Sequence, residues 1–283
     1  MKVLVLGASG MIGSTMVRVL SDSDSFEVIG TLRSEFARPI FPDFVAGKIV
    51  VGYDLTIPDH IGGLFRDFRP DVVVNCAGLT KHAPAGSDPI FALTMNSLLP
   101  HRLADYCGMT GARLIQVSTD CVFSGNKGNY SEKDQPDAVD FYGKSKQLGE
   151  VLGRNCLTLR TSTIGRELGT RRGLLEWFLA QRECKGYRRA IFSGLPTVEF
   201  ARVVRDIVIP NEELSGVYHV GSRPIDKYSL LRLIARVFEK NISIVPDDQI
   251  EINRSLDVTR FNSATGYIAA GWPELIQMIH DFQ

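Results

Sequence analysis

Short apolar runs alternate with amphipathic stretches through the first half of the chain. Continuous runs of Val, Ile and Leu are typical of strands buried on both faces, and they predict strands at residues 3–6, 26–31, 48–51, 71–75 and 112–117. The amphipathic stretches between them predict helices at 11–20, 58–68 and 88–107. This alternation favours an α/β fold with a parallel sheet and right-handed crossovers.

The alternation continues to about residue 165 and then loosens. A helix is expected from near Tyr142 to near Gly153, followed by a strand at 156–160. Beyond them, apolar periodicity predicts helices at 173–182, 197–209, 228–240 and 273–282 and strands at 216–220 and 241–245. No repeat or low-complexity linker separates the two halves. The second half is therefore expected to be a smaller region packed against the first.

A glycine-rich segment, Gly7-Ala8-Ser9-Gly10-Met11-Ile12-Gly13, joins the first predicted strand to the first predicted helix. One glycine lets the backbone turn, a second lets a pyrophosphate approach the main chain, and a third lets helix and strand pack closely. The helix N-terminus offers N–H groups to the phosphates. The alternative is an ordinary glycine-rich turn, but the strand before it and the helix after it favour a dinucleotide site. The expected contacts are Gly7, Ser9, Gly10, Met11, Ile12 and Gly13.

This segment completes the fold prediction, which is an α/β Rossmann-type doubly wound parallel sheet with a smaller C-terminal substrate-binding region. The 283 residues suffice for one large domain or two modest ones. We expect a dinucleotide-binding domain at 1–165 and a substrate-binding region at 166–283. The boundary is approximate, and strands of the second region can cross back into the first.

Charge and composition exclude several classes of partner and site. The 32 Lys and Arg residues balance the 32 Asp and Glu residues, so no global field would hold nucleic acid or an anionic membrane. No apolar run reaches the roughly 18–20 residues of a membrane helix, and the apolar start at 1–6 lacks a cleavage-site pattern. The five cysteines form no C-x-x-C pair and the five histidines no helix-spaced pair. We therefore expect a cytoplasmic protein with reduced thiols and no metal site.

The end of the second predicted strand bears on the choice of cofactor. NAD sites usually carry an acidic residue there, but this strand ends Gly30-Thr31-Leu32-Arg33-Ser34. Arg33 could pair with the 2′-phosphate of NADPH, although a solvated surface arginine is the alternative. NADPH is thus favoured, with NADH as a second option. Asp54 and Leu55, after the third strand, are placed for the adenine, unless Asp54 is a turn residue.

Two segments carry candidate chemistry. Ser118-Thr119-Asp120 ends the fifth strand, and Tyr142-Gly143-Lys144-Ser145-Lys146 opens a helix. Tyr142 and Lys146 are four residues apart and so share one helix face. Open parallel sheets bind ligands at the carboxyl ends of their strands, where Thr119 lies. Asn96, in the preceding predicted helix, either orients this site or is a surface amide.

These residue types suit the reduction of a ketone. Hydride addition gives an alkoxide that needs a proton, and Tyr142 could donate it. A tyrosine has a pKa of about 10, and a nearby ammonium is expected to lower it. Lys146 is placed for that role and could also hold the nicotinamide ribose. The Thr119 hydroxyl would bind the carbonyl oxygen.

Several segments resemble the extended short-chain dehydrogenase/reductase superfamily and, within it, the dTDP-4-dehydrorhamnose reductases. They are 7–13, 74–78, 88–96, 111–123, 142–146 with Gly149-Glu150, 159–162, 194–197, 216–219 and 254–257. The resemblance covers nearly the whole chain and is thinner after about residue 165. It implies reduction of a 4-keto group on a 6-deoxy sugar linked to a nucleoside diphosphate, as in surface polysaccharide biosynthesis.

The resemblance also implies roles for individual residues. Thr119, Tyr142 and Lys146 match the catalytic set, and Cys76, Ala77, Gly78 and Asn96 fall in segments that contact the cofactor. Ser118 and Asp120 are expected at the substrate. Asp120 is followed by Cys121, whereas dehydratases of this superfamily carry Asp-Glu, so dehydration is disfavoured.

Departures from the family pattern fall near the sugar. Members usually carry a tryptophan after the Arg-Thr-Ser strand, where this chain continues Thr163-Ile164-Gly165, so rhamnose itself is in doubt and Thr163 is expected at the substrate. Arg171 or Arg172 could grip the diphosphate, and Lys81 and His82 could touch the sugar, although each is also explained as plain surface charge. Some members use magnesium at a dimer contact, but no acidic cluster supports that here.

Two other functions remain open. One is a sugar-nucleotide epimerase that holds its cofactor tightly, and the other is a non-catalytic regulatory subunit of the same fold. The expected partner is a nucleotide-sugar substrate, with no nucleic acid and no membrane, and a homodimer is compatible with the resemblance.

Overall fold

A seven-stranded parallel sheet forms the centre of the computed structural model, which describes residues 1–35, 41–80, 88–168 and 173–282. Its strand order is β11-β6-β5-β4-β1-β2-β3. The strands are β1 (Lys2–Leu6), β2 (Glu27–Leu32), β3 (Ile49–Val51), β4 (Val72–Asn75), β5 (Arg113–Thr119), β6 (Cys156–Thr161) and β11 (Gly216–His219). Every neighbouring pair is parallel, so the predicted doubly wound sheet is confirmed.

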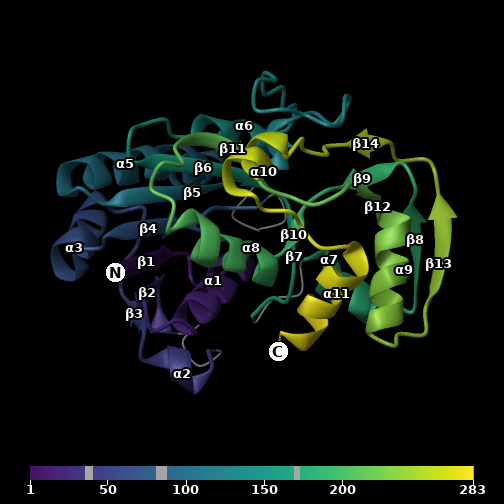
Figure 1. The fold of residues 1–283 in the computed structure, drawn as a ribbon, viewed down its shortest axis with the longest axis horizontal. Helices are drawn as coiled ribbons and strands as arrows, with labels where there is room; N and C mark the ends of the chain where they lie inside the picture. Colours follow the sequence, from purple (N-terminus) through teal and green to yellow (C-terminus); the bar gives the residue numbers. More distant parts are fainter. Residues whose placement is uncertain (36–40, 81–87, 169–172, 283) are drawn as a thin grey trace.

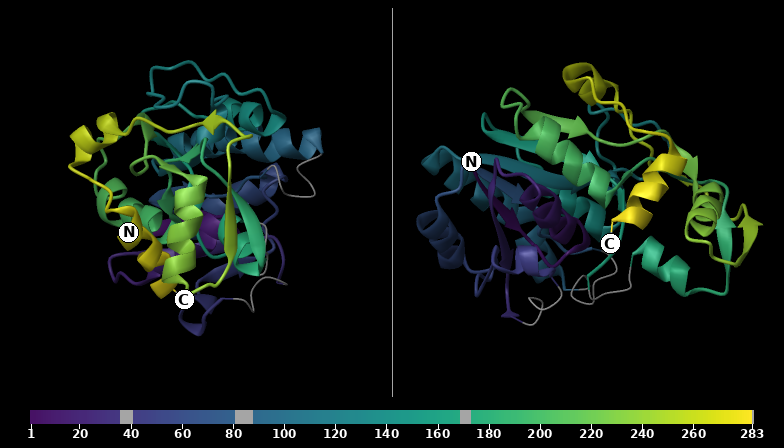
Figure 2. Two further views of the ribbon diagram at one scale, coloured as in Figure 1. Left: turned by 90° about the vertical axis from the view of Figure 1, so that its right-hand side faces the viewer. Right: turned by 60° about the horizontal axis from the view of Figure 1, so that its bottom comes forward.

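Helices cover both faces of this sheet (Figures 1 and 2). The alternating side chains of β1 separate the two cores, because Val3 and Val5 belong to one cluster and Leu4 and Leu6 to the other. The first cluster includes apolar residues of α1 (Met11–Ser21) and α8 (Thr197–Val203). The second includes those of α3 (Pro58–Phe68) and α5 (Leu99–Thr110). The apolar runs are therefore continuous because both faces of each strand are buried.

The strand order reverses between β1 and β4, and this reversal positions the site. On either side of it the connections run in opposite directions, which leaves a crevice beyond the carboxyl ends of the two strands. The Gly-rich turn follows β1, and Cys76 follows β4. Segments far apart in the sequence therefore meet at one edge of the sheet.

Two predicted helices are interrupted. The segment expected as one helix at 88–107 is α4 (Pro89–Leu93), a π-helical turn at Thr94–Leu98, and α5. Pro100 has no N–H to donate within α5, which explains why the regular ladder breaks one turn earlier. The helix expected at 197–209 likewise passes from α8 into a π-helical turn at Val204–Val208, just before Pro210.

One helix is shorter than predicted. α6 (Phe141–Leu148) ends before Gly149, whereas the sequence pattern extended it to about residue 153. A Cβ atom at position 149 would lie 1.9 Å from the carbonyl oxygen of Asn96. Gly149 thus allows the end of α6 to pack directly against the π-helical turn.

The second half of the chain divides between the sheet and an adjoining group of small elements. β11 crosses back to pair with β6, and α8 packs on α1. Most of the remaining elements lie beyond the carboxyl end of the sheet, to the right in Figure 1. They are β7 (Thr163–Ile164), α7 (Leu174–Ala180), β8 (Glu183–Tyr187), β9 (Ala190–Phe192), β10 (Leu195–Pro196), β12 (Ile225–Asp226), α9 (Lys227–Val237), β13 (Ser243–Asp247), β14 (Ile252–Asn253) and α11 (Trp272–Asp281). The last element, α10 (Thr259–Thr265), packs against β11 instead. The division near residue 165 stays a prediction.

Most of the shortest elements were not predicted from the sequence. They are the two-residue strands β7, β10, β12 and β14, the three-residue strand β9, α2 (Asp43–Ala46) and a 3-10 turn at Asp120–Val122. Such segments are too short to show a period. Across the described ranges, no helix combines the length and apolarity needed to cross a membrane.

Candidate active site

The Gly-rich turn between β1 and α1 is packed so tightly that side chains are excluded. Gly7 has a φ of 76°, and a Cβ there would lie 2.7 Å from the backbone of Ala77. A Cβ at Gly13 would lie 2.1 Å from the carbonyl oxygen of Gly7. Gly10 caps α1 without any side-chain hydrogen bond, so the N–H groups of the first turn remain for a ligand. This arrangement fits the diphosphate of a dinucleotide.

Two adjoining cavities open from this turn. One, of 280 Å³, is lined by the dinucleotide candidates Gly7, Ser9, Gly10, Arg33, Asp54, Leu55, Cys76, Ala77 and Gly78. The other, of 580 Å³, is lined by the candidates Met11, Ile12, Ser118, Thr119, Asp120, Tyr142 and Thr163. Gly10, Cys76 and Gly78 line both cavities. A long ligand could therefore extend from one to the other.

Arg33 and Asp54 both line the first cavity. Arg33 is exposed just after β2, and its charge helps to lower the pKa of the Asp54 carboxyl. Burial of that carboxyl acts to raise its pKa, but the hydrogen bonds from Thr56 and the charges of Arg33 and His60 together lower it. Asp54 Oδ1 accepts from the backbone N–H and the hydroxyl of Thr56, at 2.9 and 2.7 Å. Asp54 is thus both a turn residue and a cavity residue.

Thr119 and Tyr142 face the second cavity from two different elements. Thr119 ends β5, and its hydroxyl accepts a 3.1 Å hydrogen bond from Cys121 N while donating to Asp120 Oδ1 at 3.2 Å. Tyr142 lies in the first turn of α6. A Cβ on Gly143 would lie 2.1 Å from the carbonyl oxygen of Cys121. The start of α6 is therefore held directly against the turn that follows Thr119.

Lys146 lies one helical turn beyond Tyr142 and is 7% exposed. Its ammonium donates a 2.8 Å hydrogen bond to the carbonyl oxygen of Val117 on β5. Burial lowers the pKa of Lys146 to about 8. A Cβ at Gly78 would lie 3.7 Å from Nζ, so the ammonium borders one of the residues that line both cavities.

The expected lowering of the tyrosine pKa by Lys146 was wrong for this structure. Burial raises the pKa of Tyr142 well above its ordinary value, and Cys121 acts in the same direction. A hydrogen bond with Thr119 lowers the pKa only in part. Lys146 donates to Val117 and exerts no comparable effect on the tyrosine. Tyr142 is accordingly a protonated phenol across the neutral range.

Asn96 is buried at 1% exposure, so its interpretation as a surface amide was wrong. Its side chain donates to Leu79 O at 3.2 Å and to Ser145 Oγ at 3.0 Å, and it accepts from Leu79 N at 2.8 Å. Ser145 Oγ in turn donates to Tyr142 O. Asn96 therefore ties the segment after β4 to α6.

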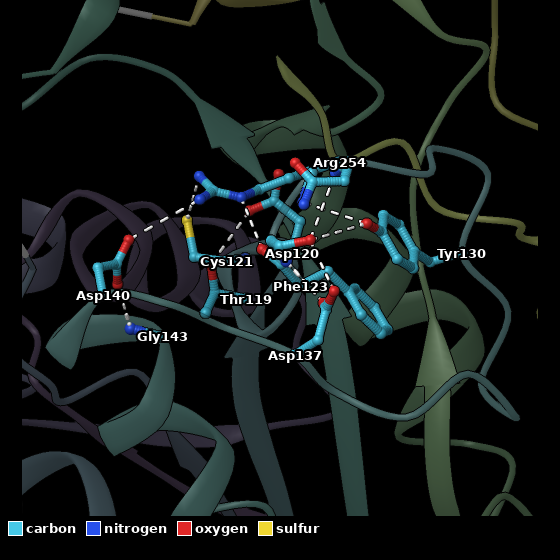
Figure 3. A network of polar contacts seen from close by, with 12 residues as sticks. Thr119, Asp120, Cys121, Phe123, Tyr130, Asp137, Asp140, Gly143 and Arg254 are labelled. Carbon is cyan, nitrogen blue, oxygen red and sulfur yellow. Dashed lines mark hydrogen bonds and ion pairs between the residues drawn. The ribbon is translucent and has the colours of Figure 1, made fainter. Parts of the chain in front are cut away.

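Arg254 was not predicted as a site residue, although it lines the second cavity. Its guanidinium donates to Phe123 O at 2.8 Å and to Cys121 Sγ at 3.6 Å, and it lies 3.8 Å from Asp140 Oδ2 (Figure 3). It thereby holds the turn after Thr119 against the start of α6. Arg254 lies more than 130 residues from Phe123 in the sequence, so no local pattern could predict this contact. The only sequence signal for Arg254 is the resemblance to the family at 254–257.

Other residues of the second half also line this cavity, including Ile191, Phe192 and Lys227. Four candidates, Lys81, His82, Arg171 and Arg172, lie outside the described residues. Within the residues that the structure does describe, no group of three or more His, Cys, Asp or Glu side chains is arranged to hold a metal ion.

Comparison with known proteins places these features in a family. The profile of the RmlD substrate binding domain matches residues 1–257. A dTDP-4-dehydrorhamnose reductase of Burkholderia thailandensis is 34% identical over 169 residues, which are 58% of this chain and 50% of that protein. The chain spans about half the length of several curated relatives that it matches.

Two further relatives match over more of the chain. The methionine adenosyltransferase 2 subunit beta of Danio rerio is 28% identical over 251 residues, which cover 84% of this chain and 74% of that protein. A dTDP-4-dehydrorhamnose reductase structure from Clostridium acetobutylicum superposes with a TM-score of 0.81 at 24% identity and covers 99% of both chains. The structural likeness confirms the fold, and the matching profile confirms the family resemblance. This chain belongs to the RmlD substrate-binding domain family.

Proposed function

We propose that this protein reduces the 4-keto group of a 6-deoxy sugar carried on a nucleoside diphosphate, with NADPH as the reductant. The observation that carries the proposal is the shared wall of one cavity, where Thr119 and Tyr142 lie beside the glycine-rich turn. The names of the reductase relatives support the same reaction class. A role in deoxysugar or surface polysaccharide biosynthesis, in the cytoplasm, belongs to this proposal.

The residues present fit the cofactor. Bound NADPH would supply the hydride. The N–H groups at the start of α1, near Gly10, Met11 and Ile12, would hold its diphosphate. Arg33 would pair with the 2′-phosphate, and Asp54 and Leu55 would border the adenine.

The remaining chemistry belongs to protein side chains. The Thr119 hydroxyl would hydrogen-bond the substrate carbonyl and the oxyanion that develops on it. Tyr142 would then donate its proton to that oxygen, and its raised pKa keeps the proton available. Lys146, with a pKa lowered by burial to about 8, stays largely cationic at neutral pH and would hold the nicotinamide ribose.

The sugar nucleotide would occupy the second cavity. Ile191, Phe192, Lys227 and Arg254 reach it from beyond residue 165, which supports a substrate-binding role for 166–283. Thr163 lines this cavity in the segment after the Arg-Thr-Ser strand, where members of the resembled family usually carry a tryptophan. A smaller side chain leaves more room, so we propose a sugar other than the rhamnose precursor or a different orientation of it.

The experiment that tests the function is NADPH oxidation, followed by absorbance, with dTDP-, UDP- and GDP-linked 4-keto-6-deoxy sugars. Turnover with one of them is the expected result and would identify the nucleotide. Tight NADPH binding without turnover on any member of the panel would contradict the proposal.

A regulatory subunit is the second candidate, because the Danio rerio relative is named as the beta subunit of another enzyme. Stable capture of a partner enzyme, together with no turnover, would favour it. An epimerase is less well supported, because Tyr142 would first have to accept a proton, and its raised pKa means that it already carries one.

The choice of cofactor gives a separate prediction. Replacing Arg33 with alanine should weaken NADPH binding at least about tenfold, or about 1.4 kcal/mol, because charge-assisted hydrogen bonds to the 2′-phosphate are lost. NADH affinity should barely change. Both dissociation constants can be measured by the quenching of protein fluorescence. Arg66→Ala, which alters an exposed arginine paired with Asp67, is the matched control. Equal losses for the two cofactors would remove Arg33 from this role.

A further inference from the structure

Three residues from segments that resemble the family have no part in the proposed chemistry, yet they are linked to one another in the fold. Glu150 follows α6, Arg160 lies on β6, and His219 ends β11. They form a chain of contacts that starts at the carboxyl end of β5: Ser118 bonds to Glu150, Glu150 to Arg160, and Arg160 to His219. The residue after Ser118 is Thr119, and Glu150 lies four residues beyond Lys146.

The Glu150 carboxylate is the centre of this group. Its Oε1 accepts from Ser118 Oγ and from Arg160 Nε, both at 2.8 Å, and its Oε2 accepts from Arg160 Nη2 at 2.6 Å. The side chains of Arg160 and Glu150 are only 5% and 8% exposed. The pair is therefore bidentate and largely removed from water, which fixes its geometry.

His219 holds Arg160 from the other side. Arg160 Nη1 lies 3.2 Å from His219 Nε2, and because a guanidinium can only donate, Nε2 is the acceptor. The ring proton is then on Nδ1, which donates to Tyr130 O at 3.0 Å. Burial and the charge of Arg160 lower the pKa of His219 to about 4, so the ring is neutral. The Phe123 ring lies 5.1 Å from the guanidinium carbon.

A buried ion pair adds little to stability, because the cost of desolvating both ions is close to the gain from pairing them. This pair instead connects every element that carries the candidate catalytic groups. It joins the end of α6, with Tyr142 and Lys146 upstream, to the end of β5, with Thr119. Lys146 makes a second connection between the same elements through Val117 O.

We propose that Glu150, held by Arg160, is a positioning residue that fixes Thr119 relative to Tyr142 and keeps the Lys146 ammonium charged. The inference deepens the proposed function and rests on it only for the effect on turnover. Its electrostatic part concerns Lys146 alone and holds for the protein without ligands.

Several groups face this network from the packed elements. Cys76, just after β4, interacts with Lys146, but burial raises the pKa of its thiol to about 12, so it carries no charge. Burial lowers the pKa of Lys146, and Glu150 opposes that effect. Beyond Arg160, Glu132 accepts from the backbone N–H of His219 at 2.9 Å. Glu150 is thus the carboxylate whose removal should affect Lys146 most.

The test measures the pKa of Lys146 directly, by the pH dependence of its side-chain NMR signal in protein labelled with ¹³C-lysine. The signal is assigned by its loss in Lys146→Met. Glu150→Gln should lower the pKa by about one unit, because it removes the opposing charge and leaves Arg160 unpaired. Arg160→Met should raise the pKa, because it leaves Glu150 unpaired beside the ammonium. Opposite shifts separate charge coupling from general disruption, which would shift both variants alike.

Folding is checked by the thermal transition of each variant. The double variant Glu150→Gln/Arg160→Met covers the case in which a single variant fails to fold. The double variant leaves no buried unpaired charge, and the loss of Glu150 should still lower the pKa of Lys146.

An unchanged pKa of Lys146, or shifts in one direction for both single variants, would overturn the proposal. If the NMR shifts appear and no sugar nucleotide is reduced, the proposed function has failed while the coupling stands. With turnover, the alkaline limb of the kcat–pH profile in Glu150→Gln should move to lower pH by the same amount.

Discussion

Replacing Tyr142 with phenylalanine is expected to lower kcat by at least about a hundredfold, the scale of losing a positioned acid. The ring that lines the cavity stays, and only the hydroxyl is removed. That hydroxyl is the group beside Thr119 that holds a proton at neutral pH, because burial raises its pKa. NADPH should still bind, since the glycine-rich turn and Arg33 are untouched.

The measurement compares kcat with the NADPH dissociation constant for the variant and for Tyr106→Phe. Tyr106 stacks on Phe65 with ring centroids 5.2 Å apart and lines neither cavity, so its variant should behave like the parent protein. A kcat within about tenfold of the parent for Tyr142→Phe would mean that another group donates the proton, because a positioned acid contributes about 10²–10⁴-fold.

The central sheet was predictable because its strands are buried on both faces. Val3, Leu4, Val5 and Leu6 are all at most 1% exposed, and such burial produces the continuous apolar run seen in the sequence. The short strands beyond residue 160 are different. β7 has two residues and β9 three, and they depend on partners elsewhere in the chain, so no period in the sequence could predict them.

The candidate site likewise has a part that the sequence predicts and a part that only the tertiary fold brings in. The glycine-rich turn and the Tyr142–Lys146 pair are local patterns, and the strand order brings them to one edge of the sheet. Arg254 reaches the same cavity from the far end of the chain, and only the tertiary fold places it there. The direction of the Tyr142 pKa shift was mistaken for a related reason. The helical spacing predicts that Lys146 is near, but it does not predict the burial that dominates the shift.

Substituting alanine for Gly13 is expected to weaken NADPH binding at least about tenfold, or about 1.4 kcal/mol, and to destabilise the fold. The added Cβ would lie 2.1 Å from Gly7 O and 2.8 Å from Gly7 C, and both are backbone atoms that cannot rotate away. The turn between β1 and α1 must therefore open, which turns the N–H groups at the start of α1 away from the diphosphate. Overpacking of this kind costs about 1–3 kcal/mol, and each kcal/mol lowers Tm by roughly 2–4 °C in chains of nearly this size.

The matched control for this substitution is Gly108→Ala. Gly108 also lies in a helix, α5, but a Cβ there meets nothing within 4 Å. It should raise stability slightly, by about 0.4–1 kcal/mol, because alanine has less freedom than glycine in the unfolded chain. Thermal unfolding gives the Tm of both variants, and NADPH titration gives their affinity for the cofactor. If Gly13→Ala kept its NADPH affinity despite the lower Tm, the start of α1 would not be what holds the diphosphate, and the cofactor would have to bind elsewhere along the two cavities.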